Sequence, residues 1–429
     1  MTSEPLKVSK QTKSKVKVKL VNLLIICLLA LSLVFQPTGW RLGLFSVSQL
    51  AIFLILLWGF ASQTFNLMHL STLLIIVGFL VISDLMISTE YRGIKLAYLI
   101  ASSFFVSRFD LDEEGLHILW NIILFSCSII LYLAVWRYIV GAPIAESENL
   151  KGVSRSADTY FYLGISYLPS TRNSDALYFI LGLLSSLRLF ASTNKMRLVY
   201  AIFSGLFAIA FVLSLSRGAI LCMLIFLLLM FPLKFNVIGL RRLLAISLGI
   251  ILSLVFVYRL LGETAWKVAR FTTSAFVSLY DPVSANSSLA GIYKYSNLDR
   301  IDLYKDAVNQ FLVFPFGQGV DSQYFDVFGG NNFLHSENLF LDFIIIFGVF
   351  SLPIFFVLLR KMKNAYALRN ESVHLRFAYS AFAVCAVFCL FNSPINLIVF
   401  WFLLSVSALE FNFGKRKNKV IKPIAVQAT

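Results

Sequence analysis

Arg217 occupies a position where a charge is costly. It belongs to the run Leu213-Ser-Leu-Ser-Arg-Gly218, which joins two apolar stretches with almost no loop between them. A charge near the apolar end of a helix costs free energy unless it has a partner or a water-filled cavity. One interpretation is a guanidinium group that reaches to the membrane interface. The other is a binding site for an anion, because the planar fork of arginine fits phosphate oxygens.

His335 is the second residue whose surroundings suggest chemistry. It comes directly before Ser336-Glu-Asn338 and an apolar run that begins near Asn338, so we expect it at the N-terminus of a helix. The positive end of the helix dipole disfavours a charged imidazolium there. A neutral imidazole can accept a proton, which is the task of a general base. Capping or anchoring the helix is the alternative role.

Arg300 lies on a predicted amphipathic helix. Asn297 can cap this helix, which we expect to run to about Leu312 and to end before Pro315. Arg300 would either bind an anion there or pair with a nearby carboxylate in solvent. Asp342 lies about one turn inside an apolar span, where a carboxylate is costly. The weaker candidates, all for substrate binding, are Arg172, Glu337, Asn338 and Asp342.

Long apolar runs must position these residues. Hydrophobic residues make up 59% of the 429-residue chain and charged residues 14%, against about 25% charged in soluble domains. A helix that crosses a hydrocarbon layer of ~30 Å needs roughly 20 apolar residues. The sequence therefore predicts an all-α, polytopic integral membrane protein with about 12 transmembrane helices and a long, partly helical outer loop. We place the spans at 20–36, 43–61, 69–88, 93–108, 117–140, 175–192, 197–216, 218–234, 241–261, 338–360, 376–392 and 394–411.

Lysines and arginines set the predicted orientation. They crowd the first nineteen residues, several short loops and the tail after Phe413, and cytoplasmic segments are typically the basic ones. Both termini and the acidic segment 110–114 then lie inside, while 141–174 and 262–337 lie outside. The basic N-terminus resembles that of a signal peptide, but without a clear cleavage site we expect an uncleaved first span.

The scattered basic residues also argue against a nucleic-acid partner, despite the net charge of +15, because they do not form one patch. Five cysteines lie inside apolar runs, so we expect buried free thiols. The spacing of His, Cys and carboxylates suggests neither a metal nor a cofactor. We divide the chain into 1–192, 193–361 and 362–429, and the middle part includes the outer segment 262–337.

The order of short motifs in the middle of the chain resembles the O-antigen ligase/polymerase family. The motifs are Ser214-Leu-Ser-Arg-Gly218, Arg300 in a long outer loop, Pro315-Phe-Gly-Gln-Gly319, His335-Ser-Glu-Asn-Leu-Phe-Leu341 and Gly348. The resemblance covers about 197–360. One departure is Ser336, since the family often has asparagine directly after the histidine. It leaves the residue that orients His335 open.

The resemblance implies a metal-independent, inverting glycosyl transfer with a GT-C-like helical fold. The donor would be an oligosaccharide on undecaprenyl diphosphate, at the outer face of a bacterial inner membrane. Arg217 and Arg300 would hold the diphosphate, and His335 would take the proton from the attacking hydroxyl. Membrane lipid, a flippase and a chain-length regulator would be partners.

Four functions stay open on sequence alone. A polymerase is favoured over a ligase because there are two sizeable outer segments, one of which carries Arg172. A ligase would use the same donor and transfer the chain to lipid A core. A transporter of lipid-linked oligosaccharide would need mid-span charges and repeated halves, whereas the sequence offers few mid-span charges and no internal repeat. A scaffold in an export assembly would not need an arginine at a span junction.

Overall fold

The structure is a computed structural model of the full 429-residue chain. It describes residues 5–34, 41–42, 45–62, 67–87, 92–140, 172–193, 196–213, 304–319, 338–391 and 398–427, together with positions 222, 225, 226 and 229. Four residues of the predicted site, Arg217, Arg300, His335 and Glu337, lie outside these ranges, as do almost all of the predicted spans 218–234 and 241–261.

The described chain is helical, apart from one short hairpin. The helices are α1 (Pro5–Ser32), α2 (Val47–Ser62), α3 (Leu67–Ile87), α4 (Arg92–Val106), α5 (Glu113–Val140), α7 (Arg172–Ser192), α8 (Arg197–Leu213), α13 (Leu339–Phe347), the 3-10 turn η2 (Gly348–Phe350), α14 (Ser351–Leu368), α15 (Val373–Phe391) and α16 (Ile398–Gln427). The hairpin pairs β1 (Arg41–Leu42) with β2 (Phe45–Ser46). The all-α prediction is therefore confirmed, with this two-residue ladder as the one departure among the described residues.

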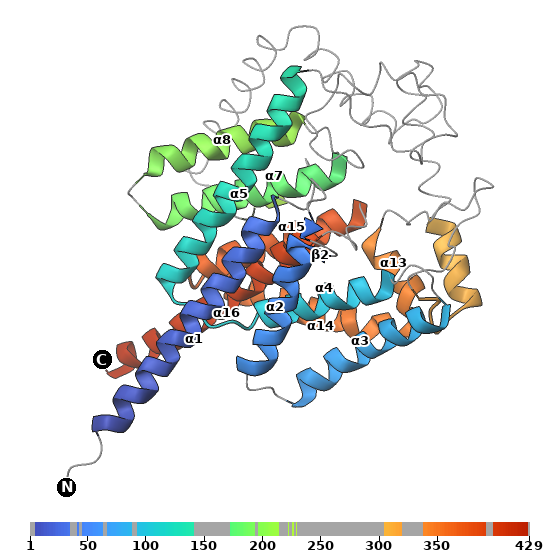
Figure 1. Ribbon diagram of the computed structural model, residues 1–429, viewed down its shortest axis with the longest axis horizontal. Helices are drawn as coiled ribbons and strands as arrows, with labels where there is room; N and C mark the ends of the chain where they lie inside the picture. Colours follow the sequence, from blue (N-terminus) through green and yellow to red (C-terminus); the bar gives the residue numbers. More distant parts are fainter. Residues whose placement is uncertain are drawn as a thin grey trace.

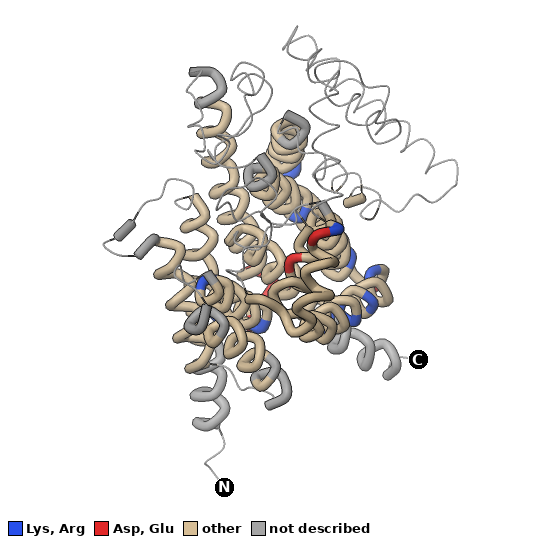
Figure 2. Tube along the Cα trace, turned by 90° about the vertical axis from the view of Figure 1, so that its right-hand side faces the viewer, with Lys and Arg blue, Asp and Glu red and all other residues tan. Residues whose placement is uncertain are grey.

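The helices form one bundle with a shared apolar core (Figure 1). In it, α5 packs against α1 and α7, and α8 lies along α7. Helix α4 packs against α2, α3 and α16, while α15 lies between α14 and α16. The free ends of α1 and α16 project from the same side of the bundle. Charged residues are sparse along the described chain (Figure 2).

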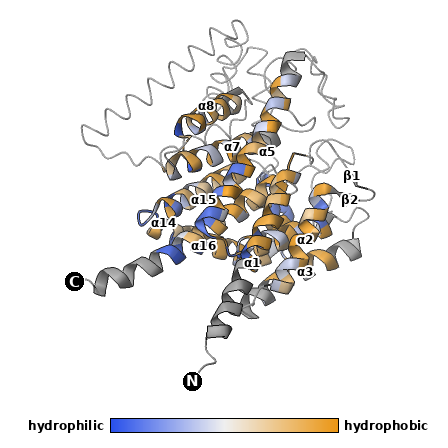
Figure 3. Cartoon of the chain, turned by 60° about the vertical axis from the view of Figure 1, so that its left-hand side comes forward, coloured by the Kyte–Doolittle hydropathy of each residue, from blue (hydrophilic) through white to orange (hydrophobic). Residues whose placement is uncertain are grey.

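Apolar side chains cover both the inside and the outside of this bundle. Hydrophobic residues colour most of each helix in Figure 3, and large apolar side chains such as Ile75, Leu198 and Phe356 are exposed. An outer surface of this kind suits lipid rather than water. Four described helices are long and apolar enough to cross a membrane, and six shorter apolar helices accompany them. A polytopic membrane protein is therefore confirmed, while the total of about 12 spans stays a prediction.

Close helix contacts depend on small residues and on polar pairs, as is usual where lipid surrounds a bundle. A side chain at Gly182 of α7 would overlap the ring of Phe207 of α8, so glycine lets these two helices approach. Ser204 of α8 donates a 2.8 Å hydrogen bond to Ser186 of α7. The five cysteines are buried and free, as predicted.

A buried ionic network joins four helices at one end of the bundle. Glu410 of α16 is fully buried, and Arg188 of α7 and His374 of α15 are almost so. Arg188 Nε donates to Glu410 Oε1 at 2.7 Å, and the indole Nε1 of Trp120 in α5 donates to Glu410 Oε2 at 3.0 Å. An arginine–carboxylate pair with further hydrogen bonds is the form in which charge is tolerated inside a bundle.

His374 completes this network through one ring nitrogen. Its Nδ1 lies 2.6 Å from Glu410 Oε1 and 2.8 Å from Arg188 Nη2. A ring nitrogen carries either a hydrogen or a lone pair, so it cannot serve both contacts. The close approach to a carboxylate requires the hydrogen to be on Nδ1, since two lone pairs would repel each other. His374 is therefore a donor to Glu410.

The tail of α16 extends this charged region to the surface. Arg416 pairs with Asp110, and Lys417 Nζ lies 2.8 Å from Glu113 Oε2. Two carboxylates of the acidic segment 110–114 are thus paired with basic residues of α16. This pairing explains why an acidic segment lies beside basic ones. Exposed pairs of this kind contribute about 0–1 kcal/mol each, so they locate the tail more than they stabilise the fold.

We predict that Glu410→Gln destabilises the protein by about 3 kcal/mol, because Arg188 is left as an uncompensated buried charge. The amide can still accept the hydrogen bond from Trp120. The double variant Arg188→Met with Glu410→Gln should recover much of this loss, since the unpaired charge is gone. Thermal unfolding in detergent measures the stability of each variant. Glu371→Gln, at an exposed carboxylate in a turn, is the matched control. Additive losses in the double variant would contradict the pairing.

Candidate functional site

The described part of the predicted site is the beginning of α13. Arg172 is the first residue of α7, and its side chain lies outside the described residues, as do Arg217, Arg300, His335 and Glu337 in full. Asn338 and Asp342 are described, and they come three and seven positions after His335. The structure therefore shows the scaffold on which the predicted base is placed, and the meeting of His335 with the two arginines stays a prediction.

Asn338 fixes where α13 begins. Its backbone is extended, and its side-chain oxygen accepts hydrogen bonds from the amides of Phe340 at 2.9 Å and Leu341 at 3.3 Å. An asparagine in this role satisfies amides that the first turn of a helix leaves free. The side-chain nitrogen of Asn338 donates to the carbonyl of Leu390 in α15. One residue thus sets both the start of α13 and its position against α15.

Asp342 lies in the first turn of α13 and is completely buried. A carboxylate in the first turn interacts favourably with the positive end of the helix dipole. The prediction that Asp342 sits one turn inside an apolar span is confirmed by these bounds. Its burial inside the bundle indicates a supporting position beneath the start of α13.

The long apolar span that begins with α13 is broken near its middle. Residues Leu339–Leu368 form one apolar stretch, but α13 ends at Phe347 and α14 begins only at Ser351, after the turn η2. In a continuous helix the amide of Val349 would donate to the carbonyl of Ile345. That hydrogen bond is not made, because the Val349 amide donates instead to Pro315 at 2.8 Å.

The turn Pro315–Gly319 fills the break. Gln318 donates its amide to the carbonyl of Ile345 at 2.9 Å, and Gly319 donates its amide to Ile346 at 3.2 Å. The turn thus supplies the partners that the broken helix lacks. Inside a membrane every backbone group needs such a partner, and non-helical backbone is tolerated only where protein provides it.

Two glycines allow the backbones to approach this closely. Gly317 and Gly348 have φ angles of 90° and 56°, a region that favours glycine. A Cβ at Gly348 would overlap the carbonyl oxygen of Pro315, and one at Gly317 would overlap that of Ile346. The Pro315–Gly319 motif and Gly348 therefore meet in one backbone contact. Both belong to the motifs that carry the family resemblance.

The segment before the turn is helical over 304–313. This confirms the predicted end of the amphipathic helix near Leu312, while its predicted start at Asn297 lies outside the described residues. Beyond the helix, the side chain of Gln318 donates to that of Gln310 at 2.7 Å and ties the turn back to it. The helix and the turn therefore form one unit.

This unit presents a large apolar surface, with Leu312, Val313, Phe314 and Phe316 all at least half exposed. The ring of Phe316 lies 6.4 Å from that of Phe350 in η2, which is also exposed, so the surface continues onto the broken span. Contiguous exposed apolar side chains are typical of lipid contact.

The depth of the turn follows from the length of α13. Nine helical residues rise about 14 Å, which is nearly half of the ~30 Å apolar layer of a typical bilayer. If Asn338 marks the boundary of that layer, the turn Pro315–Gly319 lies well inside it. On that placement, the turn Pro315–Gly319 is a re-entrant part of the predicted outer segment 262–337.

Sequence reasoning missed the buried network of Arg188, His374 and Glu410. A signal was present, because Arg188 and Glu410 each interrupt an otherwise apolar run, with opposite charges and near the predicted cytoplasmic end of their spans. No group of three or more His, Cys, Asp or Glu residues suited to a metal ion occurs within the described residues.

We predict that Gly348→Ala displaces the turn, since alanine meets the Pro315 carbonyl and the positive φ adds about 1–2 kcal/mol of strain. With cysteines at positions 316 and 350 in a background free of other cysteines, a short thiol cross-linker should join the turn to η2. Gly348→Ala should reduce this cross-link severalfold. Gly78→Ala is the matched control, since a Cβ there meets nothing within 4 Å. Equal cross-linking in both would argue against the docked turn.

A comparison with protein families adds an identification to this geometry. The model of the family described as O-antigen ligase matches residues 202–356. The match includes the turn Pro315–Gly319, Asn338, Asp342 and the break at Gly348. No curated protein matches the chain. Members of the matched family are membrane enzymes of the glycosyltransferase type that act on lipid-linked polysaccharide. The match over residues 202–356 supports the resemblance to the O-antigen ligase/polymerase family that the sequence motifs indicated.

Proposed function

We propose that this protein polymerises lipid-linked polysaccharide repeat units at the outer face of a bacterial inner membrane. The donor would be an oligosaccharide on undecaprenyl diphosphate, and the acceptor another lipid-linked repeat unit. The observation that carries the proposal is the half-helix α13. It starts four residues after His335 and is held by a turn that comes from the segment carrying Arg300.

This arrangement suits a substrate that is partly lipid and partly sugar. A diphosphate sits at the membrane surface, with its polyprenyl chain among acyl chains and its sugars in water. The exposed side chains of Phe314, Phe316 and Phe350 offer an apolar surface at the C-terminal end of α13, opposite its start at Asn338. The N-terminal end of a half-helix carries positive potential, which favours an anionic group near it.

The reaction would be a single displacement at the anomeric carbon of the donor. The acceptor hydroxyl attacks this carbon, its proton passes to the neutral imidazole of His335, and the bond to the diphosphate breaks. Because attack and departure occur on opposite faces, the configuration inverts. Arg217 and Arg300 would stabilise the negative charge that develops on the leaving diphosphate, so the reaction would need no metal.

Four further residues complete the proposed site. Arg172 and Glu337 would contact the substrate, as the sequence analysis placed them. For Asn338 and Asp342, we assign a positioning role, because Asn338 is engaged in capping α13 and Asp342 is buried beneath its first turn. Both would then orient the segment that carries His335.

A ligase is the second candidate, because the matched family model is described as O-antigen ligase. It would use the same donor and the same chemistry, with lipid A core as the acceptor. Both termini would lie in the cytoplasm in either case, on the basis of the lysine and arginine distribution. A flippase that delivers the donor and a chain-length regulator would be natural partners of a polymerase.

We expect His335→Ala to reduce transfer by about a hundred- to ten-thousandfold, which is what a positioned base contributes. The protein should still insert and accumulate. His69→Ala, a histidine on α3 that the predicted topology places inside, is the matched control. The readout is the polysaccharide ladder in cells that produce the variant. A normal ladder without His335 would refute its role as the base.

Arg217→Lys and Arg300→Lys should also be severely impaired, because lysine keeps the charge but lacks the two-pronged fork. Transfer in vitro from a defined lipid-linked oligosaccharide measures this loss. Arg360→Lys, on an exposed turn of α14, should transfer normally. Full activity in both site variants would show that bidentate phosphate binding is not needed.

A deletion strain separates the two candidate reactions. Loss of a polymerase should leave a single repeat unit attached to lipid A core. Loss of a ligase should leave none attached, while finished polymer accumulates on its lipid carrier. Gel separation of the lipopolysaccharide distinguishes these patterns, and the second would overturn the polymerase proposal in favour of the ligase.

A further inference from the structure

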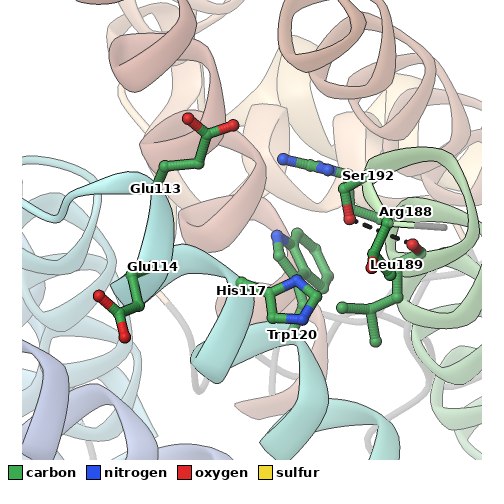
Figure 4. Close-up of a pocket in the computed structure, with 8 residues that line it drawn as sticks. Glu113, Glu114, His117, Trp120, Arg188, Leu189 and Ser192 are labelled. Atoms are coloured by element: carbon green, nitrogen blue, oxygen red, sulfur yellow. Dashed lines mark hydrogen bonds between the residues drawn. The ribbon is translucent and has the colours of Figure 1, made fainter. Parts of the chain in front are cut away.

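A cavity of about 440 Å³ lies between α5 and the end of α7, beside the buried ionic network (Figure 4). One wall carries Glu113, Glu114 and His117 of α5, and the opposite wall carries Leu189 and Ser192 of α7. The ring of Trp120 and the guanidinium group of Arg188 line the space between the two walls. The chemistry of the proposed glycosyl transfer uses none of these residues.

Arg188 brings a nearly buried positive charge to this cavity. Its side chain is only 6% exposed, and its Nε donates to Glu410, while its Nη2 lies 2.8 Å from His374 Nδ1 without donating to it. Among the described residues, none accepts a hydrogen bond from its Nη1. The guanidinium group extends from α7 toward the space between Glu113 and Trp120 (Figure 4). A free amino group of arginine in such a place can bind a phosphate oxygen.

The α5 wall carries the opposite charge. Glu113 is paired with Lys417 of the α16 tail, whereas Glu114 has no hydrogen-bond or ionic partner among the described residues. A carboxylate without a competing partner can bind an ammonium group. The cavity therefore offers a carboxylate on its α5 side for a cation and a guanidinium group on its α7 side for an anion.

The outer surface of α5 indicates where such a ligand comes from. Ile118, Phe125 and Tyr132 are exposed and lie at intervals of seven residues, so they form one stripe along the helix. Glu114, one turn before Ile118, stands at the end of the same stripe. An acyl chain lying along this lipid-facing stripe would carry its headgroup to Glu114 and to the mouth of the cavity.

We propose that this cavity binds the headgroup of an aminophospholipid, a lipid with a primary ammonium group and a phosphate. The ammonium group lies at Glu114, and the phosphate lies at Arg188 Nη1. The basic tail of α16 enters the same region through Lys417, so the headgroup belongs to the cytoplasmic leaflet. The inference does not depend on the proposed glycosyl transfer.

The test compares retention of two lipids by the purified protein. The detergent-solubilised protein is mixed with equal amounts of phosphatidylethanolamine and phosphatidylglycerol with identical acyl chains, and the bound lipid is counted by native mass spectrometry. We expect about a fivefold preference for the amine lipid, the ratio that an exposed ion pair produces. Equal retention of the two lipids would overturn the proposal.

Two variants locate the preference in this cavity. Glu114→Gln should abolish it, since the amide carries no charge, and Ser192→Phe should abolish it by filling the cavity from the end of α7. Glu371→Gln, an exposed carboxylate away from the cavity, should keep the preference. A preference that survives both cavity variants, or that Glu371→Gln removes equally, would contradict the assignment.

A soluble headgroup distinguishes a lipid from a free phosphoamine. Glycerophosphoethanolamine at millimolar concentration should leave the bound lipid in place, because it lacks the acyl chains that pack on α5. Complete displacement would show that the site takes a soluble ligand, which overturns the choice of a lipid. All variants are compared at matched thermal stability, so that a loss of the fold is not read as a loss of binding.

Discussion

The insertion of the turn Pro315–Gly319 into the broken span is the interaction on which the candidate site depends. A helix break inside a membrane exposes carbonyl and amide groups that neither lipid nor water can satisfy. Here three backbone hydrogen bonds from one turn satisfy them. The turn and the break therefore supply hydrogen-bond partners to each other. Gly317 and Gly348 make their contact sterically possible. The position of α13 against the turn follows from this contact.

Buried polar groups obtain their partners in different ways at the two ends of the bundle. At the end with α13, the backbone itself departs from regular helix, and the polar groups are matched by another backbone. At the end with Arg188 and Glu410, the helices are unbroken and the charges are matched by side chains from four helices. The first arrangement can hold a loop at membrane depth. The second fixes helices against one another, because a buried charge left without its partner is strongly destabilising.

The two arrangements suit different tasks in the proposed glycosyl transfer. The donor must bring its diphosphate to the edge of the apolar layer, where the acceptor hydroxyl is in water. The turn with exposed phenylalanines provides apolar surface at the C-terminal end of α13, opposite its polar start. The rigid network at the other end holds α5, α7, α15 and α16 in place, and Asn338 connects α13 to α15.

The sequence by itself determined the polytopic helical class, the buried thiols, the end of the outer helix near Pro315 and the resemblance of residues 202–356 to the O-antigen ligase/polymerase family. Each follows from local properties: apolar run length, the missing amide of proline and the order of short motifs. It also named Arg172, Arg217, Arg300, His335 and Glu337, whose roles remain predictions. Only the tertiary structure joined Pro315–Gly319 to Gly348, and Arg188 to Glu410, which is 222 positions away. Such pairings depend on how helices pack, and one sequence carries no local signal for which distant groups will satisfy each other.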